Sequence, residues 1–513
     1  MTEPPKPDPT TTASKCPSGS FADGCAVTSP CRALILRSRA GRVQRLDHGA
    51  RADLHSRLAV KEEGETRGRT EPRRSAVSAS VIFEPLRFRN LTVKNRILRS
   101  STGGRWDNYD GSGTQTRINW DLKTARGGVG AIISSHAPVQ PRGRLLPGYA
   151  LIDRDDRVPF WRELIHRIHE HDCKYILQLA HAGRERIIGG FEFPKGVSAT
   201  DKPEPLNGFE CERLTTPEIH ELIDAFAAGA RRAREAGADG VELAGANGVL
   251  FTQFLSSAIN DRSDEYGGSL ENRARFALDV VRAVRAEVGD DFFLGFKISV
   301  REHLKEILPW LERGNTLEES LQVCRWLEEA GVDCIHVSAG GEFPHPRNPA
   351  GDFPTKDVVK TYDGLASNGL YTFRNYLVFR WWPLNAIWKW HWERPSRKGV
   401  EGINLADARA VKQAVSIPVV CTGGFQTASV IADAIDRGDC DGVTIARGLI
   451  ANPDLVRLFE QGHDSPPRPC TFCNKCLFAF VENPLGCYDE RRFASREEML
   501  RQIFSTYEEA TAA

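Results

Sequence analysis

Four cysteines near the end of the 513-residue chain have the spacing of a metal site: Cys470, Cys473, Cys476 and Cys487. Three of these thiols fall within seven residues, and the fourth follows after a short loop. This spacing matches iron–sulfur ligation better than zinc ligation, which usually draws on two separated pairs of ligands. The motif therefore predicts an iron–sulfur site in the C-terminal part of the chain.

Two apolar segments end in residues that suit an anion. Residues 418–422 run into Gly423 and Gly424, and residues 442–445 run into Ala446 and Arg447. Glycines let backbone N–H groups approach an anion closely, and an arginine adds a fixed positive charge. A single Gly-Gly pair after a strand is usually only a turn, but two such ends together predict a pocket for a phosphorylated cofactor.

Polar side chains also stand at the ends of two other apolar segments. Gln178, His181 and Arg184 lie in QLAHAGR, and Lys297 lies in GFKIS. A glutamine amide can bond the pyrimidine edge of a flavin, and a lysine can stabilise the negative charge of the reduced ring. The alternative is that each is a rim residue with partners inside the protein. Because they come from different segments that face one mouth, we favour the cofactor interpretation.

The segments that carry these residues alternate with helical patterns, the rhythm of parallel strands joined by crossover helices. Eight strands are predicted, at 96–101, 130–135, 174–179, 240–243, 293–298, 334–337, 418–422 and 442–445. Helices are predicted at 161–171, 216–236, 273–288, 317–330, 405–414 and 426–437. Eight such units predict an α/β fold of the TIM (β/α)8 barrel type. A doubly wound sheet is the alternative, but no GxGxxG follows the first strand.

The remaining segments lie outside this repeat. Residues 1–80 are rich in Pro, Ser, Thr and Arg and predict a disordered leader, and the barrel is expected over 81–465. An aromatic and basic insertion, about 342–403, interrupts the unit after the sixth strand, and 466–513 form a cysteine-rich extension. We favour a helical lid for the insertion, and a peripheral membrane-surface anchor is the alternative.

Composition narrows the class of protein. Lys plus Arg equals Asp plus Glu at 68 each, which gives no electrostatic footprint for nucleic acid as a partner. No run of residues is long and apolar enough to predict a transmembrane span. The 13 cysteines form no disulfide framework, so a reducing, cytoplasmic location is expected.

Several long motifs, in order, resemble one family. They are IFEPLRFRNLTVKNRI, QLAHAGR, GADGVELAGANGVLFTQFLSSAINDRSDEYGGSLENRARF, VVCTGGF and DGVTIARGLIANPDL. Over roughly 82–459 the chain resembles the old yellow enzyme group, FMN-dependent NAD(P)H:flavin oxidoreductases built on an eightfold barrel. The resemblance implies FMN as cofactor, with Ser101 and Thr102 along the flavin, Gln178 and Lys297 at its pyrimidine edge, and Gly423, Gly424, Ala446 and Arg447 around its phosphate.

The chain departs from this family where substrate is handled. Alkene-reducing relatives use a His-x-x-His or His-x-x-Asn pair to bind the substrate oxygen and then a tyrosine to donate a proton. This chain has Ala244, Asn247 and Val249 there. Asn247 is the one oxygen-binding group that is retained, and the resemblance to 2,4-dienoyl-CoA reductases implies His345 as the replacement proton donor. His181 and Tyr266 are weaker candidates.

The resemblance extends to the cysteines, because 2,4-dienoyl-CoA reductase and trimethylamine dehydrogenase carry a 4Fe-4S cluster after the barrel. Only 26 residues follow Cys487, so a cluster-free cysteine loop is the alternative. The expected function is NADH- or NADPH-dependent, ping-pong hydride transfer through FMN to an electron-poor enone or enoyl-type small molecule. The alternatives are a flavin-dependent amine or ether dehydrogenase or demethylase, and a non-enzymatic flavin electron carrier.

Overall fold

The fold was examined in a computed structural model that describes residues 80–186, 193–306, 308, 310 and 314–508. The expected leader at 1–80 lies almost entirely outside these residues. Within them, no helix is both long enough and apolar enough to pass through a bilayer.

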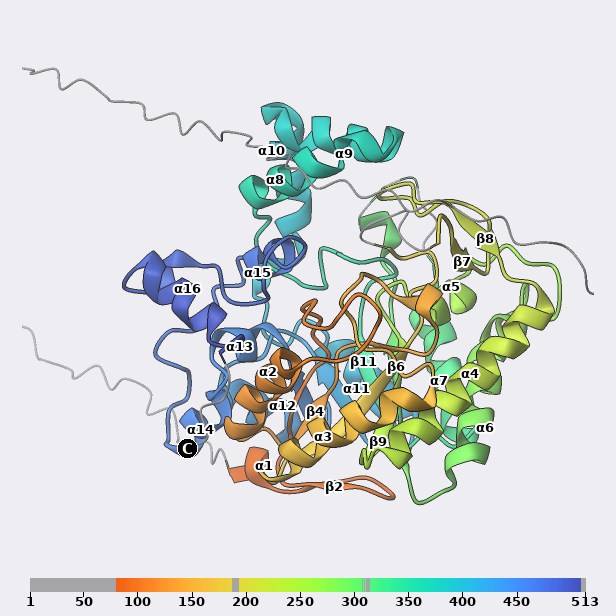
Figure 1. The fold of residues 1–513 in the computed structure, drawn as a ribbon, viewed down its shortest axis with the longest axis horizontal. Coiled ribbons are helices and arrows are strands. Elements are labelled where there is room, and N and C mark those ends of the chain that lie inside the picture. Colours follow the sequence, from red (N-terminus) through yellow and green to blue (C-terminus); the bar gives the residue numbers. More distant parts are fainter. Residues whose placement is uncertain (1–79, 187–192, 307, 309, 311–313, 509–513) are drawn as a thin grey trace, which may run out of the picture. The chain divides into compact units, whose positions relative to one another are not determined.

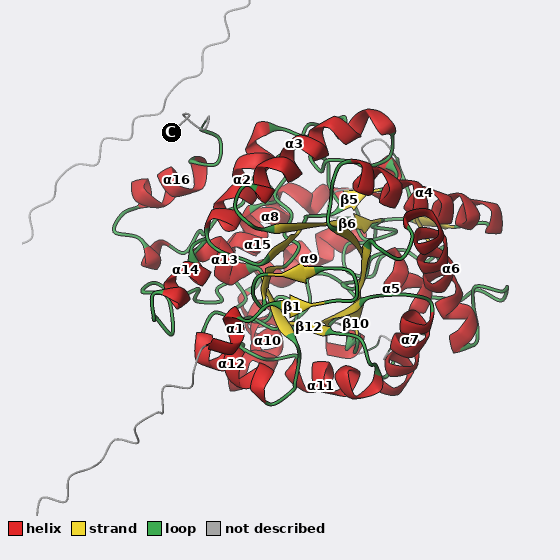
Figure 2. Ribbon diagram, turned by 90° about the horizontal axis from the view of Figure 1, so that it is seen from below, coloured by secondary structure: helices red, strands yellow, loops and turns green. Residues whose placement is uncertain are grey.

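Eight parallel strands close into a barrel, with helices around it (Figure 2). In chain order they are β3 (Ile97–Arg99), β4 (Ala131–Ile133), β6 (Lys174–Ala180), β9 (Gly240–Gly245), β10 (Phe293–Ser299), β11 (Cys334–Ser338), β12 (Val419–Thr422) and β13 (Gly442–Ile445). The ring closes because β13 pairs with β3, as in Thr444 with Leu98, and β4 pairs with β6. The barrel predicted from the sequence is confirmed.

The outer helices follow their strands. They are α2 (Gln115–Arg126), α3 (Val158–His169), α4 (Thr216–Glu235), α5 (Leu250–Leu255), α6 (Leu270–Val288), α7 (Leu317–Glu329), α11 (Leu405–Ala414), α12 (Ala428–Asp436), α13 (Arg447–Ala451) and α14 (Leu455–Glu460). Helices α4 and α7 each begin with a capping box. The side chain of Thr215 or Thr316 accepts from a backbone N–H of the first turn, and a glutamate side chain accepts from the backbone N–H of that threonine.

Short elements decorate the barrel. They are α1 (Ser80–Phe83), the antiparallel pair β1 (Leu86–Arg87) and β2 (Thr92–Val93), β5 (Ala137–Pro138), and the pair β7 (Gly196–Ser198) and β8 (Cys211–Arg213). Side chains from β1 and β2 pack with Leu98, Ile176 and Phe293 in one apolar cluster, so this hairpin plugs the amino end of the barrel.

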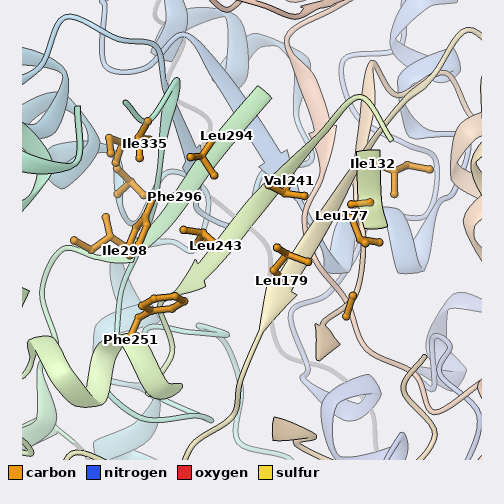
Figure 3. Packing of buried hydrophobic residues seen from close by; sticks show 14 of the residues in the cluster. Ile132, Leu177, Leu179, Val241, Leu243, Phe251, Leu294, Phe296, Ile298 and Ile335 are labelled. Atoms are coloured by element: carbon orange, nitrogen blue, oxygen red, sulfur yellow. The ribbon is translucent and has the colours of Figure 1, made fainter. Parts of the chain in front are cut away.

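Strand residues alternate between two environments, as strand geometry requires. Leu177, Leu179, Leu294, Phe296 and Ile298 belong to the large core between barrel and helices (Figure 3). The residues between them, such as Gln178 on β6 and Lys297 on β10, therefore point into the barrel. The interior is apolar at its amino end and polar toward the carboxyl ends of the strands, where the site is found.

The insertion after β11 folds as three helices, α8 (Thr355–Leu365), α9 (Leu370–Arg380) and α10 (Trp382–Glu393), which lie together and apart from the barrel helices (Figure 1). They share a small apolar core around Phe353 and Phe379. The cysteine-rich extension carries α15 (Lys475–Ala479) and α16 (Arg496–Phe504), and Phe478 of α15 packs on Phe353.

Candidate functional site

A cavity of about 200 Å³ opens at the carboxyl ends of the barrel strands. Its lining comes from the ends of β3, β6, β9, β10, β12 and β13, from the insertion, and from the cysteine-rich extension. All eight residues predicted to hold a cofactor line this cavity: Ser101, Thr102, Gln178, Lys297, Gly423, Gly424, Ala446 and Arg447. Residues up to 346 positions apart in sequence are thus brought to one space by the closure of the barrel.

A buried hydrogen-bonded chain forms the floor of the cavity. Gln178 Nε2 donates to Glu242 Oε1 at 2.6 Å, and Glu242 Oε2 lies 2.7 Å from His336 Nδ1. A carboxylate only accepts, so Nδ1 of His336 carries the proton, and Nε2 accepts from the hydroxyls of Thr422 and Thr444. The chain fixes the Gln178 amide with its NH2 group toward Glu242, which leaves Oε1 buried and without a partner among the described residues.

Charges near this floor are balanced. Burial raises the pKa of Glu242, but His336, Lys297 and Gln178 outweigh it, so the pKa is lowered and the group is a carboxylate at neutral pH. Burial lowers the pKa of Lys297, and Glu242 opposes that shift. His136 also lines the cavity, and burial together with the Lys297 charge lowers its pKa to about 4. Lys297 is thus the basic group that faces the Glu242 carboxylate at this end.

The segment after β3 forms one wall. Thr102 Oγ1 is buried without a hydrogen-bond partner among the described residues, and Gly103 follows it. A Cβ on Gly103 would lie 1.9 Å from the hydroxyl oxygen of Tyr149, so only glycine lets the tyrosine approach. Tyr149 lines the cavity, and burial raises its pKa, so the hydroxyl keeps its proton at neutral pH.

The residues predicted to bind an anion also line the cavity. Gly424 has φ +73, a left-handed conformation that favours glycine, and a Cβ there would lie 2.7 Å from Val400 Cγ1. Arg447 Nη1 donates to Ala350 O at 2.6 Å and to Asn474 Oδ1 at 2.5 Å. Arg447 thereby connects the cavity to both the insertion and the cysteine-rich extension.

The cysteine loop lies directly beside this arginine. Cys476 lines the cavity, and the charge of Arg447 interacts with Cys470, Cys473 and Cys476. The four thiols are electrostatic neighbours, yet no three of their sulfurs lie within 4.8 Å of one another. Tetrahedral zinc with Zn–S bonds of about 2.3 Å would draw sulfurs to about 3.8 Å. As they lie in this structure, the four sulfurs are therefore not drawn together as the ligands of a bound zinc ion would be.

Two hydrogen bonds point at these sulfurs: Phe472 N donates to Cys470 Sγ at 3.4 Å, and Arg492 Nη1 to Cys487 Sγ at 3.0 Å. Gln426 holds the loop to the barrel through both its amide atoms, which bond the backbone N and O of Cys470. The six scattered cysteines at 173, 211, 324, 334, 421 and 440 are buried, as the sequence suggested.

The part of the cavity that is expected to contact substrate is largely apolar. Ala244 and Val249 line it and pack with Ala180 in a small apolar cluster. Asn247 lines it as well, with φ +66, and its Oδ1 accepts from Ser338 Oγ at 3.2 Å and from Asn348 Nδ2. With that oxygen occupied, the NH2 group of Asn247 is the part free to meet a substrate oxygen.

The two predicted catalytic histidines are not brought to the cavity. His345 is fully buried, with Nε2 bonded to His303 O at 3.1 Å and Nδ1 accepting from Arg347 N at 3.0 Å. His181 is buried too, and its Nδ1 accepts from Gly183 N. Burial lowers the pKa of both rings, to about 4 and about 3. Both rings hold loops together, which corrects the expectation that His345 faces the substrate.

A group of buried carboxylates adjoins the cavity. Single oxygens of Glu185, Glu204 and Glu342 lie within 4.8 Å of one another. Glu342 pairs with Arg184 at 2.8 Å, and Glu204 accepts from the backbone N of Asn207 at 2.7 Å. Glu185 lines the cavity, and among the described residues its Oε1 has no partner. Burial raises the pKa of Glu204 and Glu342.

Sequence reasoning missed Tyr149, His136 and Glu185. Tyr149 and His136 lie in the long connection after β4, where no regular period shows which side chains turn inward. Glu185 directly follows the recognised QLAHAGR motif, so its position at a strand end was the one available signal.

The chain resembles known protein families and solved structures. A family model described as NADH:flavin oxidoreductase / NADH oxidase matches residues 81–354, and a dihydrouridine synthase model matches residues 393–512. The fold is shared with 2-naphthoyl-CoA reductase in its 2-naphthoyl-CoA complex, at TM-score 0.66 and 24% identity, covering 80% of this chain and 56% of that one.

Among curated proteins, the chain is 32% identical to NADH oxidase of Thermoanaerobacter brockii, over 80% of this chain and 54% of that protein. It is 28% identical to N,N-dimethylglycine/sarcosine dehydrogenase of Chromohalobacter salexigens (77% and 50%) and 28% to cinnamate reductase of Clostridium sporogenes (79% and 56%). The chain spans about half the length of these relatives. A match over more than half of its residues, on a confirmed barrel, shows that the chain belongs to the NADH:flavin oxidoreductase / NADH oxidase family.

Proposed function

We propose that the protein binds FMN in the barrel cavity and uses NADH or NADPH to reduce an electron-poor, enone- or enoyl-type small molecule, with both substrates using the same pocket in turn. The observation that carries the proposal is the convergence of the eight predicted cofactor residues on one cavity. Cinnamate reductase, named for a substrate with a conjugated double bond, is among the relatives and supports this substrate class.

The residues present fit FMN. The orphaned Gln178 Oε1 is an acceptor for a ring N–H, and Lys297 suits a ring edge that gains negative charge. Gly423, Gly424 and Arg447 would hold the phosphate. When bound, FMN supplies the hydride chemistry that the amino acids lack.

The chain's own groups would then orient the substrate and deliver a proton. Asn247 offers its NH2 group to a substrate oxygen, beside the apolar surface of Ala244 and Val249. Tyr149 replaces His345 as the proposed proton donor, because its protonated hydroxyl lies against Gly103 on the wall of the cavity. His136 is neutral at pH 7 and close to Tyr149, with ring centres 6.3 Å apart.

The spectrum of the purified protein tests the cofactor, and steady-state assays test the reaction. We expect flavin absorbance that NADH or NADPH bleaches without oxygen, and recovery of the oxidised spectrum when an enone or a cinnamate-type acid is added. A folded protein that neither carries nor takes up FMN would refute the proposal. Bleaching followed by reoxidation only by a protein carrier would favour the electron-carrier alternative.

We also propose that Cys470, Cys473, Cys476 and Cys487 hold a 4Fe-4S cluster. The donor set, its spacing in the sequence and the two N–H···S bonds support this ligand over zinc. Such a group supplies one-electron transfer when bound. Arg447 would then contact the FMN phosphate while its charge acts on the cysteines.

A second candidate is oxidation of an amine. Glu185 favours it, because Glu185 lines the cavity and its Oε1 has no partner among the described residues, so it could hold a cationic ammonium group, which must lose its proton before hydride transfer. N,N-dimethylglycine/sarcosine dehydrogenase is among the relatives. Flavin bleaching by secondary or tertiary amines, but not by NADH, would favour this reaction over the first. Glu185→Gln should then lower kcat/KM for the amine, while Glu329→Gln, at an exposed position, should not.

A further inference from the structure

The helices α9 and α10 carry most of the exposed apolar surface. Of the 12 large hydrophobic side chains exposed among the described residues, eight lie between 370 and 390. They are Leu370, Tyr371, Phe373, Leu377, Trp381, Trp382, Ile387 and Trp390, and Leu370 and Trp382 are 79% and 76% exposed. We call them the α9–α10 surface. Apolar side chains concentrated in this way mark an interaction site in a water-soluble fold.

The exposed side chains are additional to those that hold the helices together. Phe379 and Trp392 are buried and pack on Phe353, with ring centres 5.5 and 5.4 Å away. Asn375 and Arg374 donate to the backbone oxygen of Leu206, which attaches α9 to the rest of the chain. The helices are thus already anchored by residues outside the α9–α10 surface.

The same segment is strongly basic. Residues 370–398 contain six Lys or Arg and one Glu, although the whole chain has 68 of each sign. Arg380 pairs with Asp363, and Lys389 pairs with Glu393. Arg394, Arg397 and Lys398 are exposed, and no ion pair to the described residues is recorded for them. The Arg397 guanidinium lies over the Trp390 ring, 5.3 Å from its centre.

We propose that the α9–α10 surface docks the protein on an anionic lipid bilayer. Exposed tryptophans and aliphatic side chains beside unpaired basic groups are complementary to an acyl boundary beneath anionic headgroups. The helices have 11 and 12 residues, or about 18 Å at 1.5 Å per residue, so they lie along the surface and do not cross it. A second copy of this chain is a poorer occupant, because equal basic patches would repel.

Docking would also orient the barrel. The insertion leaves the carboxyl end of β11, and Phe343, Asn348 and Val400 from its two ends line the cavity. The bilayer would therefore meet the protein on the cavity side of the barrel. This inference does not depend on the identity of the cofactor or the reaction.

Sedimentation of the full-length holoprotein with vesicles tests the proposal. We expect binding to phosphatidylcholine vesicles that contain phosphatidylglycerol, and at least tenfold weaker binding to phosphatidylcholine alone. Raising the salt from about 0.1 to about 0.5 M should weaken binding, because the basic groups are exposed and become screened. Quenching of tryptophan emission by brominated lipid should accompany binding.

Two sets of variants separate the apolar and the basic contributions. Phe373→Ser with Trp382→Ser should reduce vesicle binding by tenfold or more, and so should Arg397→Gln with Lys398→Gln. Phe504→Ser is the matched control, because Phe504 on α16 is 47% exposed, the same as Phe373. The control should bind like the wild type, and all variants should keep the wild-type circular dichroism spectrum.

Three results would overturn the proposal. The first is equal binding to neutral and anionic vesicles, and the second is unchanged binding of both variant pairs. The third is a protein that does not bind vesicles but forms a dimer in sedimentation velocity, when substitution of Trp382 abolishes that dimer. The last result would identify a second copy of the chain as the occupant.

Discussion

At the scale of single residues, the site depends on one buried carboxylate. Glu242 accepts from Gln178 and from His336, and its charge faces Lys297. Each contact fixes a neighbour: the Gln178 amide cannot flip, and the His336 proton stays on Nδ1. A buried charge is costly unless it is paired and hydrogen-bonded, and here every partner that stabilises Glu242 is also oriented by it. The cofactor-facing groups are therefore set before any ligand arrives.

Tyr149→Phe tests the proton donor at this scale. Removing a positioned acid slows proton transfer by about 10²- to 10⁴-fold, so reoxidation of the reduced enzyme by an enone should slow by that amount. Reduction by NADH, which needs no proton from Tyr149, should keep its rate. Stopped-flow absorbance measures both steps separately.

Tyr266→Phe is the matched control, since Tyr266 is buried in the outer core and does not line the cavity. If Tyr149→Phe and Tyr266→Phe reoxidise equally fast, Tyr149 does not donate the proton, and a water or another group must do so.

Glu302 makes a prediction about stability and pH. Burial raises its pKa to about 7 despite bonds from Ser256 Oγ and Asn315 N. The unfolded chain has a value near 4.5, so the folded state binds the proton more tightly between these pH values. The stabilisation of the fold by this proton binding at Glu302 is complete below pH 4.5 and is lost as pH rises through about 7.

The Glu302→Gln side chain stays neutral. The free energy of unfolding of this variant should therefore rise, relative to that of the wild type, by up to about 3 kcal/mol between pH 4.5 and pH 8. Urea unfolding at a series of pH values measures this difference. Glu329→Gln, at an exposed position on α7, should give a flat difference. A flat profile for Glu302→Gln as well would show that Glu302 is ionised in the fold.

At the scale of elements, the barrel strands were predictable, but several helices, α2 among them, were not. Strands β6, β9 and β10 are buried on both faces along almost their whole length and are rich in apolar residues, and their ends locate the candidate site residues. Helix α2 was missed because its buried face includes Arg117 and Asp121 among its apolar residues. Asp121 accepts from both Arg117 and Arg99, so the helix buries charge that a hydrophobic period does not reveal.

Irregular segments explain the error at His345. Its loop is held by backbone bridges between His345 and Asn348 and between Arg347 and Ala350, and His345 is buried and is not among the residues that line the cavity. No periodic rule gives side-chain direction in such a loop. The residues proposed to hold the cofactor could be placed at one cavity because they stand at strand ends, where the direction of a side chain follows from the pleat.

Substituting one cysteine of the loop tests whether the loop holds an iron–sulfur cluster. Cys476→Ser should lower the iron content from about four per chain to nearly none and remove the broad visible absorbance. Cys324→Ser, at a buried cysteine of α7 remote from the loop in sequence, should keep both. Iron analysis and absorbance of protein purified without oxygen are the measurements. Wild-type protein that lacks iron even after reconstitution would favour the cluster-free loop.

At the scale of the whole molecule, the cavity depends on closure of the barrel. Its polar floor requires β6, β9, β11, β12 and β13 to be in register, and its far wall requires the extension to reach Arg447 through Asn474. A ligand in this cavity contacts elements from most of the described chain. Its binding free energy should therefore add to the stability of the fold as a unit.

FMN should accordingly raise the thermal stability of the whole protein. A ligand that binds only the folded state stabilises it by about 2.7 kcal/mol at one hundred times its Kd. Apoprotein should thus unfold at a lower temperature than holoprotein, in one calorimetric transition that moves upward with FMN concentration. Arg447→Gln should shrink this increase, because the phosphate loses its cation, whereas Arg409→Gln, an exposed arginine paired with Asp439, should not. Because each variant is compared with and without FMN, any loss of stability in the apoprotein cancels. An unchanged increase in Arg447→Gln would place the phosphate elsewhere in the cavity.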